Sequence, residues 1–435
     1  RQLLAMRYSA RKKWWQDLEA DAAKGDSSAV QYLRNHGKQR PNFDNFVRQC
    51  GGPLEASVQI EEQMRSQFTE TDPEREVEAE RCEASLSEMS SGAEHVSISE
   101  DELMGAIERL KLAKTCGLSG ISNEFLKEVV AFPVGRDLLL HHLNTLYLHG
   151  ELPPAFCEAY VCLIPKTSNI EAATQFRPIC LLESIQKLYC GILIRRLQIP
   201  NARVQFGGLK GGQTLDALAA AQQCMAREVM SRKYSIWVSL DVAAAFDSLS
   251  HEALGKYLCA HSTDGALAFA ALRLFQIVRR PRMTCQWQGR TWDISQSRGI
   301  QQGGSHSALV FSMIIDEILT RLNEDWAARG FKSMHGIHGW AYVDDILLNF
   351  CTWMEAELLL QELADAFAAV GLKLNLHKTV VFSTQEVLQQ GRDFLGGREC
   401  LLSRCTWATS AKYLRKELKH QPEADITDLI WKQSQ

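Results

Sequence analysis

The chain has 435 residues, of which 46% are hydrophobic and 23% charged, the balance of an ordinary globular protein with two or three subdomains. Its thirteen cysteines are scattered without a CxxC pair. This pattern argues against a disulfide framework and a zinc site, and it favours a reducing compartment, nuclear or cytoplasmic. No stretch reaches the roughly 18 apolar residues of a membrane span, so we expect no membrane partner.

The formal net charge of −4 hides an uneven distribution along the chain. Residues 1–50 carry ten Lys and Arg against five Asp and Glu, whereas residues 51–110 carry four against sixteen. The rest of the chain is therefore mildly basic. Because a phosphate-binding channel needs local positive charge rather than a basic total, composition neither supports nor excludes a nucleic-acid partner.

The first 98 residues divide into two regions of opposite charge. Residues 1–50 form a basic N-terminal region, which fits either an amphipathic helix with a solvated basic face or an RNA-binding arm. Residues 51–98 are expected to be an acidic linker, although 70–95 also fit a solvated helix. A folded unit resumes at Ser99, which makes a capping box with Glu102. Since the sequence opens with Arg1 rather than Met, we expect a piece of a longer chain.

Beyond residue 100, helical and strand patterns alternate. Apolar periodicity predicts helices over 181–197 and 215–230. A buried strand is expected over 235–242, and two short strands over 340–350. These patterns indicate an α+β fold with a small, mainly antiparallel sheet.

Three carboxylates stand next to apolar strand sequences. Asp241 ends one run, and the pair Asp344 and Asp345 interrupts another. Charges beside buried strands are costly unless they are paired or bind a metal, and carboxylates are the oxygen ligands that Mg²⁺ prefers. Two such ions, with Mn²⁺ as a substitute, could activate a 3′-hydroxyl and stabilise a leaving pyrophosphate. Adjacent strand residues face opposite ways, so Asp344 and Asp345 can share one site only on a turn. A surface turn without function is the alternative for an isolated pair.

Several motifs follow one another in a recognisable order between residues 103 and 400. The first are residues 112–121 (LAKTCGLSGI), 163–166 (LIPK), 176–179 (FRPI), 205–207 (QFG) and 214–217 (TLDA). The later ones are residues 239–251 (SLDVAAAFDSLSH), 298–304 (RGIQQGG), 341–345 (AYVDD) and 371–379 (GLKLNLHKT). In this order and at this spacing, the chain resembles the reverse transcriptase of a non-LTR, LINE-type retrotransposon. It departs from the family pattern at Ser119, Gln301 and Ala308, where Asp, Arg and Pro are usual.

The resemblance implies a right-hand polymerase, with fingers over about 99–234 and palm over about 235–400 of a domain spanning 99–400. An antiparallel palm sheet would pack on helices. Residues 401–435 would begin a helical thumb from Ser410 onward and end before that thumb is complete. The implied activity is RNA-directed DNA polymerisation from a DNA primer or nicked target DNA, with template RNA and deoxynucleoside triphosphates as partners.

The resemblance also assigns roles to individual residues. Asp241, Asp344 and Asp345, with the main-chain carbonyl of Val242, would bind two Mg²⁺ ions, and Lys378 would be a general acid for pyrophosphate. The positions implied to contact the incoming nucleotide are Lys166, Arg177, Phe246, Gln302 and Gly303. Lys166 and Arg177 suit a triphosphate as a point charge and a planar fork. Ordinary surface charge is the alternative for these two cations, and a lysine at the end of a helix or strand is the alternative for Lys378.

Phe246 lies five residues after Asp241, where the family places its sugar-sensing residue. A bulky ring there would clash with the 2′-OH of a ribonucleotide, so Phe246 favours DNA synthesis over RNA synthesis. Two alternatives stay open. One is another enzyme on the same palm, such as a group II intron maturase, a telomerase or a viral RNA polymerase. The other is a decayed copy that binds RNA without polymerising.

Overall fold

The computed structural model describes residues 42–198, 201–208, 212–279, 281–304 and 306–420. Most of the basic N-terminal region predicted for residues 1–50, and the end of the predicted thumb, lie outside these ranges. The chain divides into two compact units: residues 1–60 with 163–177, and residues 61–162 with 178–435. They are called unit 1 and unit 2 below.

The described part of unit 1 is a small helical piece packed on a loop. Helix α3 (Asp44–Cys50) is followed by α4 (Pro53–Phe68), which continues into unit 2. Phe176 stacks on Phe43 and meets Phe46 edge to face, with ring centroids 5.9 and 6.2 Å apart. The backbone of Asn42 also pairs with residues 168–170. Aromatic burial and backbone hydrogen bonds thus join two segments far apart in the sequence.

A five-stranded sheet with the order β11-β10-β3-β8-β7 organises unit 2. Its strands are β3 (Ile236–Leu240), β7 (Gly339–Tyr342), β8 (Asp345–Phe350), β10 (Val380–Phe382) and β11 (Thr406–Ala408). All neighbouring pairs are antiparallel except β10 and β11. The central strands β3 and β8 are buried almost throughout because both faces are covered. The α+β class predicted from the sequence, with its mainly antiparallel sheet, is confirmed.

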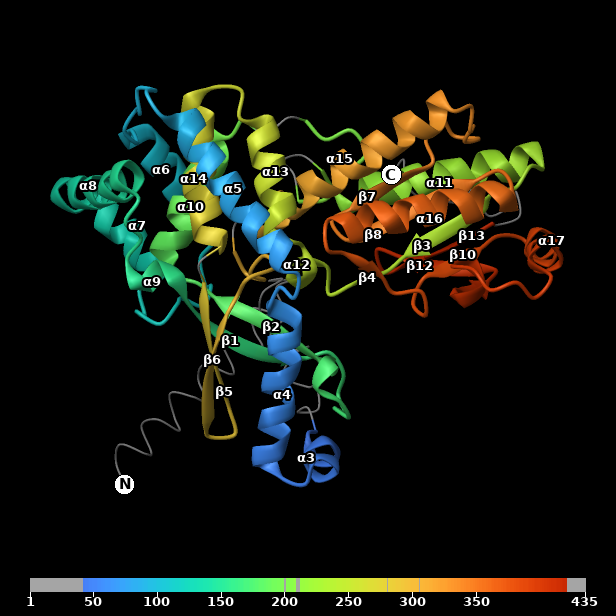
Figure 1. The fold of residues 1–435 in the computed structure, drawn as a ribbon, viewed down its shortest axis with the longest axis horizontal. Helices are drawn as coiled ribbons and strands as arrows, with labels where there is room; N and C mark the ends of the chain where they lie inside the picture. Colours follow the sequence, from blue (N-terminus) through green and yellow to red (C-terminus); the bar gives the residue numbers. More distant parts are fainter. Residues whose placement is uncertain (1–41, 199–200, 209–211, 280, 305, 421–435) are drawn as a thin grey trace, which may run out of the picture. The chain divides into compact units, whose positions relative to one another are not determined.

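Three long helices pack against this sheet (Figure 1). They are α11 (Thr214–Ser231), α15 (Ser307–Ala328) and α16 (Trp353–Ala369). Helices α11 and α15 contact β7, and α16 contacts β8. One continuous hydrophobic core runs through unit 2 and includes fully buried Trp237, Trp326 and Trp340.

The remaining elements surround this core. The other helices are α5 (Pro73–Ser90), α6 (Glu100–Glu108), α7 (Asn123–Ala131), α8 (Pro133–His149), α9 (Pro154–Cys157), α10 (Ser184–Arg196), α12 (Ala245–Ser248), α13 (His251–His261), α14 (Gly265–Arg279) and α17 (Gln385–Leu395). The other strands are β1 (Glu158–Pro165), β2 (Phe176–Leu181), β4 (Val242–Ala243), β5 (Arg282–Trp287), β6 (Arg290–Ser295), β9 (Lys373–Leu374), β12 (Ser410–Tyr413) and β13 (Lys416–Lys419). The short 3₁₀ helices are η1 (Ala173–Gln175) and η2 (Leu402–Arg404). The capping box of Ser99 and Glu102 is present at the start of α6, as predicted. Within the described ranges, no helix is both long and apolar enough to cross a membrane.

The acidic segment is not a linker. Residues 73–90 form α5, which begins where the Asp72 side chain accepts a hydrogen bond from the Glu74 amide. Ala79, Cys82 and Leu86 form a buried stripe, spaced three and four residues apart, that packs against α13 and α14. The acidic side chains occupy the other faces, and this is why the segment reads as solvated in the sequence.

The predicted start of a helical thumb at Ser410 is wrong. Residues 410–419 form the antiparallel hairpin β12–β13, which contacts β3 and β10. Ala411, Tyr413 and Leu418 are buried while their neighbours face solvent. This alternation has the period of two residues that a strand requires.

A buried carboxylate lies behind the sheet. Glu228, near the end of α11, is fully buried. It accepts hydrogen bonds from the amide and hydroxyl of Ser235, from Trp237 Nε1, and from the Nε2 atoms of His335 and His420 at 2.7 Å each. Five donors from three segments thus meet at one buried anion.

Candidate active site

The register of β3 against β8 brings two of the predicted carboxylates together. Leu240 pairs with Ile346, so the next facing positions are Asp241, at the end of β3, and Asp345, at the start of β8. Both line a cavity of about 500 Å³. Residues about a hundred positions apart in the sequence therefore meet through strand pairing.

Asp344 lies in the two-residue turn between β7 and β8. Tyr342 pairs with Asp345, so Val343 and Asp344 alone form the loop. Val343 has a φ of 59°, a left-handed conformation that is unfavourable for a β-branched residue. Asp344 thus lies in the turn, and Asp345 is the first paired residue of the strand that follows it.

The three carboxylates repel one another. Partial burial, followed by the negative charges of Asp344 and Asp241, raises the pKa of Asp345 to about 6, although its side chain keeps contact with solvent. Among the side chains that the structure describes, no three Asp, Glu, His or Cys groups are placed so that they alone could hold a metal ion, as a cage of protein ligands would. Mg²⁺ needs no such cage, because water and substrate phosphates complete its shell. A cluster of oxygen donors with excess negative charge therefore fits a hard divalent cation.

The backbone of Asp241 is fixed by the turn that follows β9. The Asn375 amide donates to the Asp241 carbonyl at 2.8 Å, and the Thr379 hydroxyl accepts from the Asp241 amide at 3.3 Å. Lys378 belongs to the same turn, is exposed, and lines the cavity with Asp241 and Asp345. Its ammonium group is thus available to an anion in the cavity. Val242, whose carbonyl was predicted as a ligand, begins β4 and pairs with Leu374.

Phe246 lies on α12, directly after the segment that carries Asp241. The residue before this helix, Ala244, has a φ of 47°, which turns the chain sharply after β4. The Phe246 ring stacks on Phe311 of α15 with centroids 4.8 Å apart, and its carbonyl accepts from the Ile300 amide. The ring is half-buried, and its position is fixed by these two contacts.

Gln302 and Gly303 form a loop that is fixed against β2 and α12. The Gln302 side chain donates to the Asp247 carboxylate at 2.8 Å, and its carbonyl accepts from the Cys180 amide at 2.7 Å. Gly303 has a φ of 119°, and an added Cβ would overlap the Cys180 carbonyl. Asp247 is 2% exposed and also accepts from Gln67. Sequence reasoning missed this long-range role of Asp247.

The hairpin β12–β13 is a second feature that the sequence did not reveal at the site. Its residues Ser410, Ala411, Lys412 and Glu417 line the same cavity as the carboxylates. The basic residues of this stretch were predicted to lie on a thumb helix instead. An alternating strand reading of residues 410–419 could have corrected that prediction.

Ser119, a departure from the family pattern, is accommodated by a hydrogen-bonded turn. Its amide and hydroxyl both donate to the carboxylate of Glu183, which is buried just before α10. Gln301, another departure, has a buried side chain.

Lys166 and Arg177 belong to unit 1 and are described there by themselves. The Lys166 amide donates to the Gln175 carbonyl, and its ammonium group donates to the Thr174 carbonyl at 2.7 Å. Arg177 is exposed on β2. Unit 2 thus brings together the three carboxylates and Lys378. Phe246 lies on α12, the helix whose Asp247 bonds Gln302.

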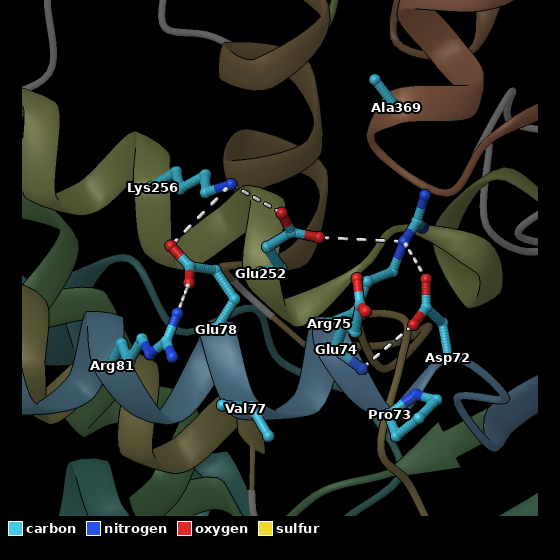
Figure 2. Close-up of a pocket in the computed structure, with 10 residues that line it drawn as sticks. All are labelled: Asp72, Pro73, Glu74, Arg75, Val77, Glu78, Arg81, Glu252, Lys256 and Ala369. Atoms are coloured by element: carbon cyan, nitrogen blue, oxygen red, sulfur yellow. Dashed lines mark hydrogen bonds and ion pairs between the residues drawn. The ribbon is translucent and has the colours of Figure 1, made fainter.

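A separate cavity of about 720 Å³ lies between α5 and α13 (Figure 2). Its charged groups pair with one another. Lys256 bonds Glu252 at 2.6 Å, and Arg81 bonds Glu78 at 3.1 Å. Arg75 lies 3.7 Å from both Asp72 and Glu252, and it donates to the Ala368 carbonyl near the end of α16. The contacts of Arg75 with Glu252 and with the Ala368 carbonyl join α5 to α13 and α16.

Comparisons with known proteins agree with this geometry. Residues 164–414 match the family model described as reverse transcriptase (RNA-dependent DNA polymerase). The retrovirus-related Pol polyprotein from type-2 retrotransposable element R2DM of Drosophila melanogaster is 26% identical over 304 residues, covering 68% of this chain and 27% of that protein. A Pol polyprotein from type-1 retrotransposable element R2 of Popillia japonica is 27% identical over 290 residues, covering 66% and 39%. The transposon TX1 uncharacterized 149 kDa protein of Xenopus laevis is 25% identical over 332 residues, covering 73% and 25%. The chain thus spans between a quarter and two fifths of the length of these relatives.

Proposed function

Because the chain belongs to the reverse transcriptase (RNA-dependent DNA polymerase) family, we propose that it extends the 3′-OH of a DNA primer on an RNA template. The observation that carries this proposal is the strand register that sets Asp241 opposite Asp345, with Asp344 in the adjoining turn. This is a cluster of hard oxygen ligands beside an open cavity, and two-metal nucleotidyl transfer needs such a cluster.

The chemistry divides between the metal ions and the side chains. Two Mg²⁺ ions, or Mn²⁺ in their place, would be held by Asp241, Asp344, Asp345 and the Val242 carbonyl, and would activate the 3′-OH and stabilise the pyrophosphate. Lys378 is suited to donate a proton to the leaving pyrophosphate. The half-buried Phe246 ring, stacked on Phe311, would exclude a 2′-OH.

The other nucleotide contacts follow from the family pattern. Lys166 and Arg177 would bind the triphosphate. Gln302 would contact the incoming nucleotide, with its side chain oriented by Asp247, and Gly303 would let the backbone approach closely.

We assign residues 99–234 to the fingers and 235–400 to the palm of a right-hand polymerase. Strands β3, β7, β8 and β10, with helices α15 and α16 packed against them, support the palm assignment. A thumb would begin beyond β13 rather than at Ser410.

The names of the relatives favour a non-LTR retrotransposon as the biological setting. Template RNA, a DNA primer or nicked target DNA, and deoxynucleoside triphosphates would then be the partners. All thirteen cysteines are free, which suits a reducing compartment, nuclear or cytoplasmic. The decayed-copy alternative is disfavoured because the site keeps its costly acidic cluster, and no packing requirement calls for acids there.

Primer extension on an RNA template with Mg²⁺ and deoxynucleotides tests the proposal. We expect extension by the native chain and a loss of at least about 10³-fold in Asp241→Asn and Asp344→Ala, since metal-bound charge stabilises the transition state. Asp393→Asn, a change of an exposed acid on α17, is the matched control and should extend normally. Extension that survives in Asp241→Asn, or no extension by folded native chain, would overturn the proposal.

A further inference from the structure

The turn that carries Asp344 is held by a side chain from a different part of the chain. Gln205 lies in a segment that runs beside β7, and it is only 6% exposed. Its Oε1 accepts from the Val343 amide at 2.8 Å, and its Nε2 donates to the Val343 carbonyl at 3.2 Å. One carboxamide therefore satisfies both backbone groups of the residue before Asp344.

The same segment is built to place this carboxamide. The Phe206 amide donates to the Ala341 carbonyl, and the Ala341 amide donates to the Val204 carbonyl, both at 2.8 Å. Gln205 Oε1 also accepts from the Gly207 amide at 2.9 Å. A Cβ at Gly207 would lie 2.7 Å from the Val343 amide nitrogen, so only glycine allows this approach.

Val343 needs such a support because its conformation is unfavourable. At a φ of 59° a β-branched residue is strained, and strain of this kind persists only where the surroundings fix it. A relaxed Val343 would rotate the peptide that leads into Asp344 and move both carboxylates of the pair relative to Asp241.

We propose that Gln205 is a positioning residue for nucleotidyl transfer: its carboxamide holds Val343 left-handed and thereby sets Asp344 and Asp345 beside Asp241. This inference rests on the proposed function for its catalytic readout, but the bracing itself is a property of the turn. Gln205 touches no reacting group; it acts through the backbone of Val343.

The test compares Gln205→Leu with Asp316→Asn. Asp316 accepts from the Val204 amide at 2.8 Å and the Arg203 amide at 3.1 Å. Asp316→Asn thus loosens the same segment without removing the carboxamide at Gln205. We expect Gln205→Leu to lower kcat by roughly 10- to 100-fold, the usual effect of a misplaced catalytic group, with little change in KM for the primer. Asp316→Asn should keep kcat within about threefold.

A metal-free readout accompanies the kinetics. Amide hydrogen exchange, measured by mass spectrometry with fragmentation to single residues, should show Val343 losing protection in Gln205→Leu but not in Asp316→Asn. Val343→Gly, which removes the left-handed penalty, should shrink the kcat loss caused by Gln205→Leu in the double variant.

The outcomes separate the inference from the proposed function. Unchanged kcat in Gln205→Leu, or equal loss in Asp316→Asn, would overturn the positioning role. An equal kcat loss with and without Val343→Gly would overturn the link to the backbone strain. If the native chain does not extend a primer, the proposed function fails, and the exchange of Val343 alone decides whether Gln205 braces the turn.

Discussion

Replacing Glu228 with Gln removes a buried negative charge at nearly constant size, and we expect it to destabilise unit 2 strongly. Burial opposes the charge on His335, but its hydrogen bonds with Cys224 and Glu228 outweigh burial and raise its pKa from 6.5 to about 9. Each pKa unit corresponds to about 1.4 kcal/mol, so the hydrogen bonds of His335 with Cys224 and Glu228 together contribute about 3 kcal/mol to the free energy of unfolding. Glu228→Gln removes one of these bonds and also weakens those from His420 and Ser235, so it should lose about 3 kcal/mol at pH 6, in line with the ~3–5 kcal/mol for breaking a buried pair.

The sign of the pH dependence follows from the two shifts. Because the pKa of His335 is raised, its contribution is complete below about pH 6.5 and is lost as the pH rises to about 9. Burial would raise the pKa of Glu228, but hydrogen bonds from His335, His420 and Ser235 lower it to about 2. On the acid side, stability is therefore lost as the pH falls from about 4.5 towards 2. The two shifts share the hydrogen bond between His335 and Glu228 and are therefore not added.

Urea unfolding followed by tryptophan fluorescence measures this effect, because Trp237 donates to Glu228 and reports on its surroundings. The difference between the native chain and Glu228→Gln should be about 3 kcal/mol at pH 6 and below ~1 kcal/mol at pH 9.5. Glu357→Gln is the control, since its pairing with Arg398 at 3.4 Å is exposed and should contribute less than ~1 kcal/mol. A difference that is absent at pH 6, or that stays constant to pH 9.5, would refute the reasoning.

Three further changes test other parts of the structure. Phe246→Val should raise the ratio of ribonucleotide to deoxyribonucleotide kcat/KM in single-nucleotide extension by roughly 10- to 100-fold, and an unchanged ratio would show that the ring is no gate. Asp247→Asn weakens the charge-assisted bond to Gln302 by ~1.5 kcal/mol, so KM for the deoxynucleotide should rise about 10-fold. A KM equal to that of the native chain would show that Asp247 does not orient Gln302 for nucleotide binding. Leu86→Ala, at a fully buried position of α5, should lower the free energy of unfolding in urea by ~2–5 kcal/mol. An unchanged free energy of unfolding would show that α5 is a linker and does not pack in the core.

The sequence predicted the residues of the site better than it predicted their connections. Asp241 and the pair Asp344 and Asp345 could be found because acids beside buried strands are costly and therefore informative. The register that sets Asp241 opposite Asp345 could not be found, since pairing between strands a hundred residues apart leaves no local pattern. The bracing of Val343 by Gln205 was hidden for the same reason.

The predictions of an acidic linker and of a helical thumb failed because the pattern of charges was stronger than the pattern of buried residues. In residues 73–90 the buried stripe consists of Ala79, Cys82 and Leu86, which carry little apolar weight against the surrounding glutamates. In residues 410–419 the cations at Lys412, Lys416 and Lys419 are spaced as on one helix face, and this spacing masked the alternation of buried residues. In both cases tertiary packing decided the structure rather than the charge pattern.

The two-residue turn between β7 and β8 limits how this chain can change length. Side chains alternate between the faces of a strand, so one residue inserted into β8 would move every later side chain to the other face. An insertion between Tyr342 and Asp345 would enlarge a loop that now holds only two residues. The loop after α17, residues 396–401, pairs with no strand of the sheet and carries no such restriction. In a lineage of copies that accumulate insertions and deletions, we therefore expect length variation to collect after α17 and to be absent from the β7–β8 hairpin in every copy that still polymerises.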